Sequence, residues 1–123
     1  MTPQISIATG ALFGMLAVIF GAFGAHFLKK TLNTNQLQSF ETGVKYQMYH
    51  AIVLLVIGLS NNAMIPTTVY WCFTLGIILF SFSIYGLVFS DSKGKKLKFL
   101  GPITPVGGLL LVVGWGLLLV YAI

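Results

Sequence analysis

Few side chains in this sequence could do chemistry, and the two histidines, His26 and His50, are the first candidates. With Glu41 they form the only plausible set of metal ligands, and they lack the His-x-x-x-His spacing that places two ligands on one helix face. We therefore expect no metal site. A haem held between histidines of neighbouring helices stays open as an alternative. Because there is also no phosphate-binding loop and no set of nucleophile, base and orienting residue, we expect neither an enzyme nor a bound cofactor.

The composition determines which class of protein must position these residues. Of the 123 residues, 57% are apolar and 7% are charged, and the mean hydropathy is +0.94. A soluble domain carries about 25% charged residues, so a soluble globular fold is excluded. The lone Cys72 excludes a disulfide scaffold. We predict an integral membrane protein with a single domain, 1–123.

The charges define the membrane spans. They fall into two clusters, 29–45 and 91–98, and leave three charge-free windows, 1–28, 46–90 and 99–123. About 20 helical residues cross a hydrocarbon layer of about 30 Å, so the middle window can cross it twice, with a break at Asn61, Asn62 and Pro66. We predict an all-α fold because these windows lack the alternation of barrel strands. The expected arrangement is a compact bundle of four transmembrane helices near 5–28, 44–60, 67–89 and 105–123.

The second helix is expected to begin in water before it enters the membrane. Asn33 or Asn35 can cap it, with Gln36 or Gln38 three residues further on. An apolar stripe then leads into the hydrocarbon layer near Gly43.

The lysines predict the orientation. All of them lie in the connections after the first and third spans, which share one side of the membrane. The positive-inside rule assigns that side to the cytoplasm and both termini to the other side. The net charge of +5 is then explained by topology and by attraction to anionic lipid headgroups, so we expect the lipid bilayer as a partner and no nucleic acid.

Small residues form a heptad seam on the first span, at Gly10, Gly14, Ala17, Gly21 and Gly24. Such a seam allows close backbone approach, which drives helix association in lipid. It predicts either tight packing inside one chain or a self-association face.

Polar side chains gather in the half of the membrane next to the lysines. Because polar groups are costly in hydrocarbon, we expect them to point into the bundle and form a polar pocket. A histidine whose hydrogen bonds are satisfied by a neighbouring hydroxyl or carbonyl explains His26 and His50 equally well. The candidate pocket residues are His26, Tyr46, Gln47, His50, Ser81, Ser83, Tyr85 and Thr104.

The start of the fourth span is a second candidate site. Thr104 can cap the helix, Pro105 suits its first position, and Gly107 with Gly108 leaves N–H groups uncovered by side chains. Such a turn could hold an anionic or carbonyl oxygen. An ordinary capped start, with glycines for close packing, is the alternative.

Four motifs in this order resemble a known family over nearly the whole chain. They are GAFGAH at 21–26, FETGVKYQMYH at 40–50, FSFSIY at 80–85 and GPITPVGG at 101–108, followed by Gly114 and Trp115. The sequence resembles the family catalogued as domain of unknown function 423. The resemblance implies a small, multi-pass protein of the bacterial inner membrane with four helices and no assigned activity.

Two functions fit these observations. The first is a non-catalytic helix-packing protein that forms a homo-oligomer or serves as an accessory subunit of a larger membrane complex. The second is binding or transport of a small solute, a proton or a lipid headgroup through the polar pocket. The missing catalytic groups favour the first, and the gathered polar residues favour the second.

Overall fold

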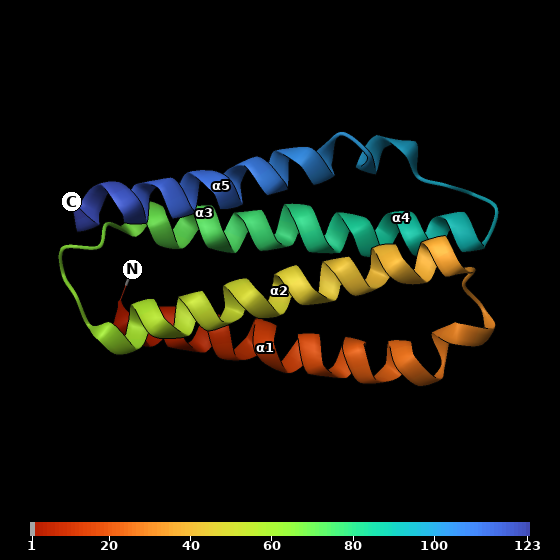
Figure 1. The fold of residues 1–123 in the computed structure, drawn as a ribbon, viewed down its shortest axis with the longest axis horizontal. Coiled ribbons are helices and arrows are strands. Elements are labelled where there is room, and N and C mark those ends of the chain that lie inside the picture. Colours follow the sequence, from red (N-terminus) through yellow and green to blue (C-terminus); the bar gives the residue numbers. More distant parts are fainter. Residues whose placement is uncertain (1) are drawn as a thin grey trace.

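The computed structural model is all-helical and describes residues 2–123, except for the side chain of Ala25. Its helices are α1 (Pro3–His26), η1 (Leu28–Lys30), α2 (Thr34–Ser60), α3 (Thr67–Ile77), η2 (Ile78–Phe82), α4 (Ser83–Ser92), η3 (Lys98–Leu100) and α5 (Ile103–Ala122). Because η2 joins α3 and α4 without a break, the described residues form four long helical rods (Figure 1). Each rod is long and apolar enough to cross a membrane, which agrees with the four predicted spans.

Local capping explains where the first two rods begin and end. The Thr2 side chain accepts a hydrogen bond from the Ile5 N–H, and Pro3 occupies the first turn of α1. Asn33 and Gln36 form the predicted capping box at the start of α2. α2 then ends at Asn61, which adopts the left-handed conformation with φ of 49°. The predicted break between the second and third spans is therefore confirmed.

The start of α5 differs from the sequence prediction. The helix begins at Ile103 rather than Pro105, and Pro102 occupies the cap position without a side-chain hydrogen bond. The Thr104 hydroxyl contacts the Ser83 hydroxyl at 2.5 Å and the Leu100 carbonyl at 3.4 Å. Thr104 is therefore inside the first turn of α5 and does not cap it, and its hydroxyl joins α5 to the neighbouring rod.

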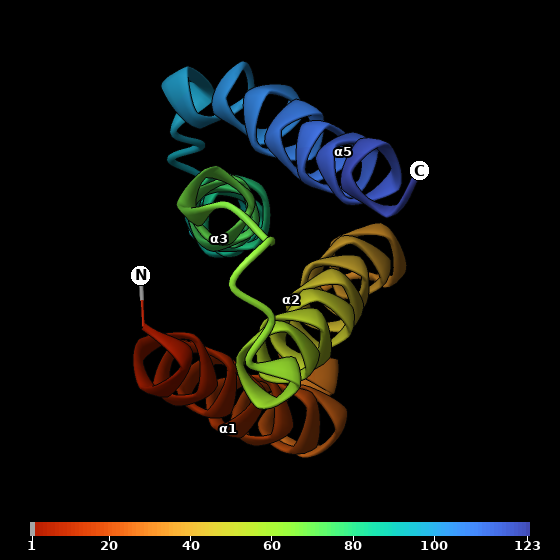
Figure 2. The same ribbon diagram turned by 90° about the vertical axis from the view of Figure 1, so that its left-hand side faces the viewer.

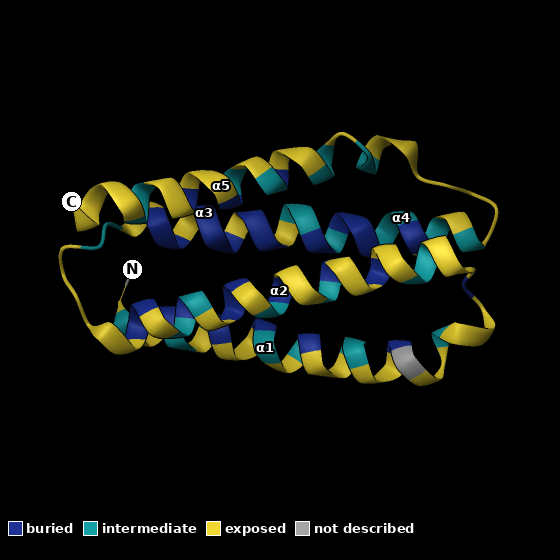
Figure 3. Cartoon of the chain, viewed as in Figure 1, coloured by how far each residue is buried: buried dark blue, intermediate teal, exposed yellow. Residues whose placement is uncertain are grey.

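The rods pack in an order that follows the chain. α1 packs on α2, α2 packs on the α3–η2–α4 rod, and that rod packs on α5 (Figure 2). The α3–η2–α4 rod is the most buried, whereas α1 and α5 expose most of their surface (Figure 3). Both termini lie at one end, and both lysine-bearing connections lie at the opposite end.

The small-residue seam of α1 faces α2 of the same chain. A Cβ atom at Gly10 would lie 2.7 Å from the Ala51 carbonyl oxygen, and one at Gly24 would lie 2.6 Å from the Phe40 ring. Ala17 between them is 1% exposed. Because α2 fills this seam, the seam mediates close packing within the chain, and α2 occupies the surface that a second copy would need.

A π-helical turn, η2, lies at the middle of the third rod against Gly107 of α5. A Cβ atom at Gly107 would lie 2.3 Å from the Phe80 nitrogen and 2.6 Å from the Leu79 carbonyl carbon. π-turns widen a helix locally and are frequent at functional positions. Here the wider turn brings two backbones into direct contact, which only glycine permits.

Replacing Gly107 by Ala should destabilise the protein, because its Cβ would collide with the backbone of η2. We expect a loss of about 1 to 3 kcal/mol in the free energy of unfolding. Gly116→Ala on the same helix is the control, since nothing lies within 4 Å of a Cβ there and Ala favours a helix by about 1 kcal/mol. Thermal unfolding in mild detergent, followed by circular dichroism, measures both. Equal melting temperatures would contradict the close contact between α5 and η2.

Candidate functional site

Gln47 is the most connected of the predicted pocket residues. Its side chain is fully buried on α2, where the amide nitrogen donates to the Phe13 carbonyl of α1 at 2.8 Å. Its amide oxygen accepts a hydrogen bond of 2.6 Å from the Tyr85 hydroxyl of α4. Because both ends of the amide are satisfied by neighbouring helices, Gln47 joins three rods inside the hydrocarbon layer.

Other buried hydroxyls also bond across helix interfaces. Ser81 in η2 donates to the Gly43 carbonyl of α2 at 2.7 Å, and Ser6 of α1 donates to the Leu54 carbonyl of α2 at 2.7 Å. The Thr9 and Tyr70 hydroxyls, on α1 and α3, lie 2.8 Å apart. Among residues 2–123, the Thr74 hydroxyl is the one buried side-chain polar group without a hydrogen-bond partner.

His50 connects α2 to the fourth rod, α5, and also contacts the preceding turn of its own helix. The Trp115 indole N–H of α5 donates to His50 Nε2 at 3.0 Å, and His50 Nδ1 lies 2.7 Å from the Tyr46 carbonyl. Because an indole nitrogen can only donate, Nε2 must accept and Nδ1 must carry the proton. The hydrogen bonds therefore fix a neutral imidazole in one tautomer. The Tyr46 ring lies beside it against Phe80, with 4.9 Å between ring centroids.

Ser83 and Thr104 form the link between the third rod and the start of α5. The Ser83 hydroxyl also lies 2.9 Å from the Phe80 carbonyl. Gly107 is closed off by the η2 backbone, and a Cβ atom at Gly108 would lie 3.5 Å from the Phe80 ring. The predicted turn for an anionic or carbonyl oxygen is thus packed against the third rod.

The eight predicted pocket residues form several small groups rather than one lining. Hydrogen bonds join the residues in three pairs. They are Gln47 with Tyr85, His50 with the Tyr46 carbonyl, and Ser83 with Thr104. Ser81 bonds to the backbone of α2. His26 is exposed at the end of α1, away from all three pairs. Most of these side chains hold helices together through hydrogen bonds.

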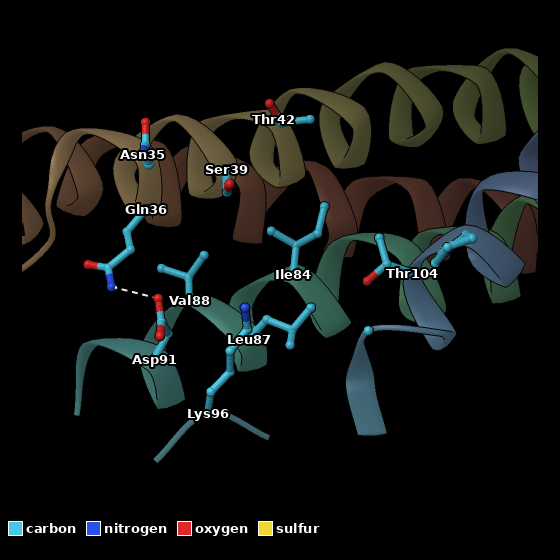
Figure 4. Close-up of a pocket in the computed structure, with 12 residues that line it drawn as sticks. Asn35, Gln36, Ser39, Thr42, Ile84, Leu87, Val88, Asp91, Lys96 and Thr104 are labelled. Carbon is cyan, nitrogen blue, oxygen red and sulfur yellow. Dashed lines mark hydrogen bonds between the residues drawn. The ribbon is translucent and has the colours of Figure 1, made fainter. Parts of the chain in front are cut away.

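A polar groove opens at the lysine-bearing end, between the start of α2, the end of α4 and the start of α5 (Figure 4). Its volume is about 490 Å³. The α2 side contributes amide and hydroxyl groups, α4 contributes an apolar floor, and Lys96 reaches in from the loop after α4. The lining residues are Asn35, Gln36, Ser39, Thr42, Ile84, Leu87, Val88, Asp91, Lys96, Gly101, Thr104 and Pro105.

Hydrogen bonds hold the walls of the polar groove in place. The Gln36 side-chain nitrogen donates to the Asp91 carboxylate at 2.9 Å, which ties the capping box of α2 to α4. The loop after α4 is anchored on Ser90, whose hydroxyl accepts from the Leu97 N–H at 3.1 Å and whose carbonyl accepts from the Lys95 N–H at 3.0 Å. Two of the lining residues, Asp91 and Lys96, carry opposite charges.

Of the residues that line this groove, the sequence prediction placed only Thr104 in the polar pocket, and it named Asn35, Gln36 and Pro105 only for the starts of helices. Two signals could have located it. Asn35, Ser39 and Thr42 recur at steps of four and three near the start of α2, and Asp91 is one of only two acidic residues. Within residues 2–123 no three His, Cys, Asp or Glu side chains are grouped as metal ligands.

Four apolar rods, whose buried side-chain polar groups in residues 2–123 other than the Thr74 hydroxyl have hydrogen-bond partners, define a multi-pass membrane protein. The model of the family described as "Protein of unknown function (DUF423)" matches residues 20–108. The chain belongs to this family, and it lies in the bacterial inner membrane.

Relatives match over nearly the full length of both chains. A UPF0382 membrane protein of Staphylococcus aureus (strain bovine RF122) is 40% identical over 95% of this chain and 93% of its own length. A UPF0382 membrane protein of Staphylococcus saprophyticus is 39% identical over 95% of each chain. The UPF0382 inner membrane protein YgdD of Escherichia coli is 36% identical over all of this chain and 92% of its own length. No solved structure matches the chain significantly.

Proposed function

We propose that this protein binds a zwitterionic group, with one amine and one phosphate, in the polar groove, and that it is not an enzyme. The observation that carries the proposal is that one acidic and one basic residue, Asp91 and Lys96, line the same groove of about 490 Å³. The chain has few charged residues, and here a carboxylate and an ammonium group lie on neighbouring walls of one groove. Their charges are complementary to those of an amine and a phosphate.

The remaining lining supports the same chemistry. An amine would lie against the Asp91 carboxylate, and a phosphate would lie against Lys96 and the hydroxyl and amide groups of Asn35 and Ser39. The apolar floor, formed by Ile84, Leu87 and Val88, suits the methylene groups between them. The headgroup of an aminophospholipid and a free phosphorylated amine share this chemistry.

We also propose that the polar groove faces the cytoplasmic leaflet and that both termini lie outside. Six of the seven lysines, including Lys96 at the groove, lie in the two connections at that end of the four rods, and Lys45 lies within α2. The positive-inside rule supports this orientation, and the part of α2 before Gly43 would lie at headgroup depth.

Self-association or an accessory role in a larger complex is the second proposed function. It is favoured by α5, whose buried residues are Gly107, Leu111 and Gly114, so most of its apolar surface is left for lipid or for another helix. The seam on α1 gives it no support, because α2 covers that seam.

Replacing Asp91 by Asn should weaken binding of dioleoyl phosphatidylethanolamine, because the amine loses its carboxylate partner. We expect the dissociation constant to rise about two- to fivefold, the range for a solvent-exposed charge pair. Native mass spectrometry in mild detergent measures lipid binding and reports whether chains associate. O-phosphoethanolamine is titrated in parallel to separate a free solute from a lipid headgroup.

Glu41→Gln is the matched control, since Glu41 is the other acidic residue and does not line the groove. Lys96→Gln should weaken binding as well, while Lys98→Gln should not. If Asp91→Asn and Glu41→Gln bind both probes equally, the proposed ligand is wrong. A dimer without bound lipid would favour the association function instead.

A reporter fused after Ile123 tests the orientation. Alkaline phosphatase should be active at this position and inactive when fused after Gly94, because the lysine-bearing loops are held in the cytoplasm. Green fluorescent protein should give the opposite pattern. The same activity at both positions would contradict the proposed orientation.

A further inference from the structure

A second groove, distinct from the polar groove, lies at the same end of the molecule between α1, the start of α2 and α4. We call it the aromatic groove; five of its lining residues are Phe20, Phe23, Phe27, Phe40 and Phe89. Leu28 and Tyr85 complete it, and its volume is about 400 Å³. The Tyr85 hydroxyl is bonded to Gln47 in the interior, so the groove surface is apolar.

The walls of the aromatic groove are held by ring contacts. Phe23 stacks on Phe27 with 5.4 Å between ring centroids, and Phe40 contacts Phe89 edge-on at 5.8 Å. On the inner side, the Phe20 ring meets Tyr85 at 5.3 Å. Such aromatic pairs contribute about 0.5 to 1.5 kcal/mol each beyond their buried area, so these contacts favour the walls as they stand in the ligand-free structure.

Two lysines directly follow the lining of this groove in the sequence. Leu28 lines it, and the next two residues of η1, Lys29 and Lys30, are exposed. Lysines at the membrane surface attract anionic lipids by about 1 kcal/mol each, which corresponds to about fivefold in affinity. An apolar groove whose lining residue Leu28 is followed by two exposed lysines is complementary to an acyl chain with a phosphate at its head.

We infer that the aromatic groove holds one acyl chain of an anionic phospholipid, with its phosphate on Lys29 and Lys30. A partner helix is the weaker fit, because it would have to bring its own acidic residues to this position. The inference is independent of the polar groove, which is lined by other residues and faces α5 rather than α1.

Lys29→Gln combined with Lys30→Gln should lower the affinity for dioleoyl phosphatidylglycerol about fivefold for each lysine replaced. Native mass spectrometry of the whole protein in mild detergent counts the bound lipid. Lys93→Gln with Lys95→Gln is the control, since it removes the same charge from the other connection, where neither lysine is next in sequence to a lining residue of the aromatic groove. Dioleoyl phosphatidylethanolamine binding should be the same in both variants.

A second pair of variants tests the acyl chain. Phe27→Asn should reduce retention of phosphatidylglycerol, because it puts an amide at the groove mouth, whereas Phe99→Asn should not. These residues are 66% and 65% exposed, so both variants should fold equally well. The inference fails if phosphatidylglycerol binds equally to the Lys29/Lys30 and Lys93/Lys95 variants, or if Phe27→Asn matches Phe99→Asn. A lipid-free dimer that Phe27→Asn dissociates would overturn it in favour of a second copy.

Discussion

The fold depends on one constraint, which is that polar side chains inside a lipid bilayer must find their hydrogen bonds within the chain. Water is absent there, and each unsatisfied group costs several kcal/mol. The Gln47 amide meets this constraint by bonding to α1 with one end and to Tyr85 of α4 with the other. Ser6 and Ser81 meet it by donating to carbonyl groups of α2. These bonds fix the rotation and depth of each rod relative to its neighbour, which apolar contacts in lipid do only weakly.

Close backbone approach makes these hydrogen bonds reachable. Gly10 lets α1 lie against the Ala51 carbonyl, and Gly107 lets α5 lie against the π-turn η2. Serine is a short side chain, so it can reach a carbonyl on another helix only where the backbones are this close. At the lysine-bearing end the constraint is relaxed because water and headgroups are present. There the chain leaves Asn35, Ser39 and Lys96 lining an open groove, and the candidate binding surfaces are concentrated at that end.

Patterns that act over short distances along the chain predicted much of this structure. The charge-free windows predicted four spans, Asn33 and Gln36 predicted the capping box, and the break at Asn61 was found where two amides precede a proline. Six of the eight predicted pocket residues are buried or half-buried, whereas His26 and Tyr46 are exposed, contrary to the prediction. The partners of the buried residues depend on how the rods are rotated. The bond from Trp115 to His50 joins residues on different rods, and the π-turn at Ile78–Phe82 changes the helical register near Ser81 and Ser83. Neither has a signature in sequence spacing. Thr104 was predicted to cap α5, but the helix begins one residue before it, and its hydroxyl contacts Ser83 of the neighbouring rod.

A double-mutant cycle on Gln47 and Tyr85 tests the central constraint most directly. Gln47→Met, Tyr85→Phe and the double variant are compared by the free energy of unfolding in mild detergent or bicelles. Because the two groups are bonded at 2.6 Å in a buried environment, the account predicts a coupling energy between about 0.6 and about 1.7 kcal/mol. If the effects of the two single variants sum to that of the double variant within about 0.3 kcal/mol, the account is contradicted. Additivity would mean that the two side chains act independently and share no stabilising hydrogen bond.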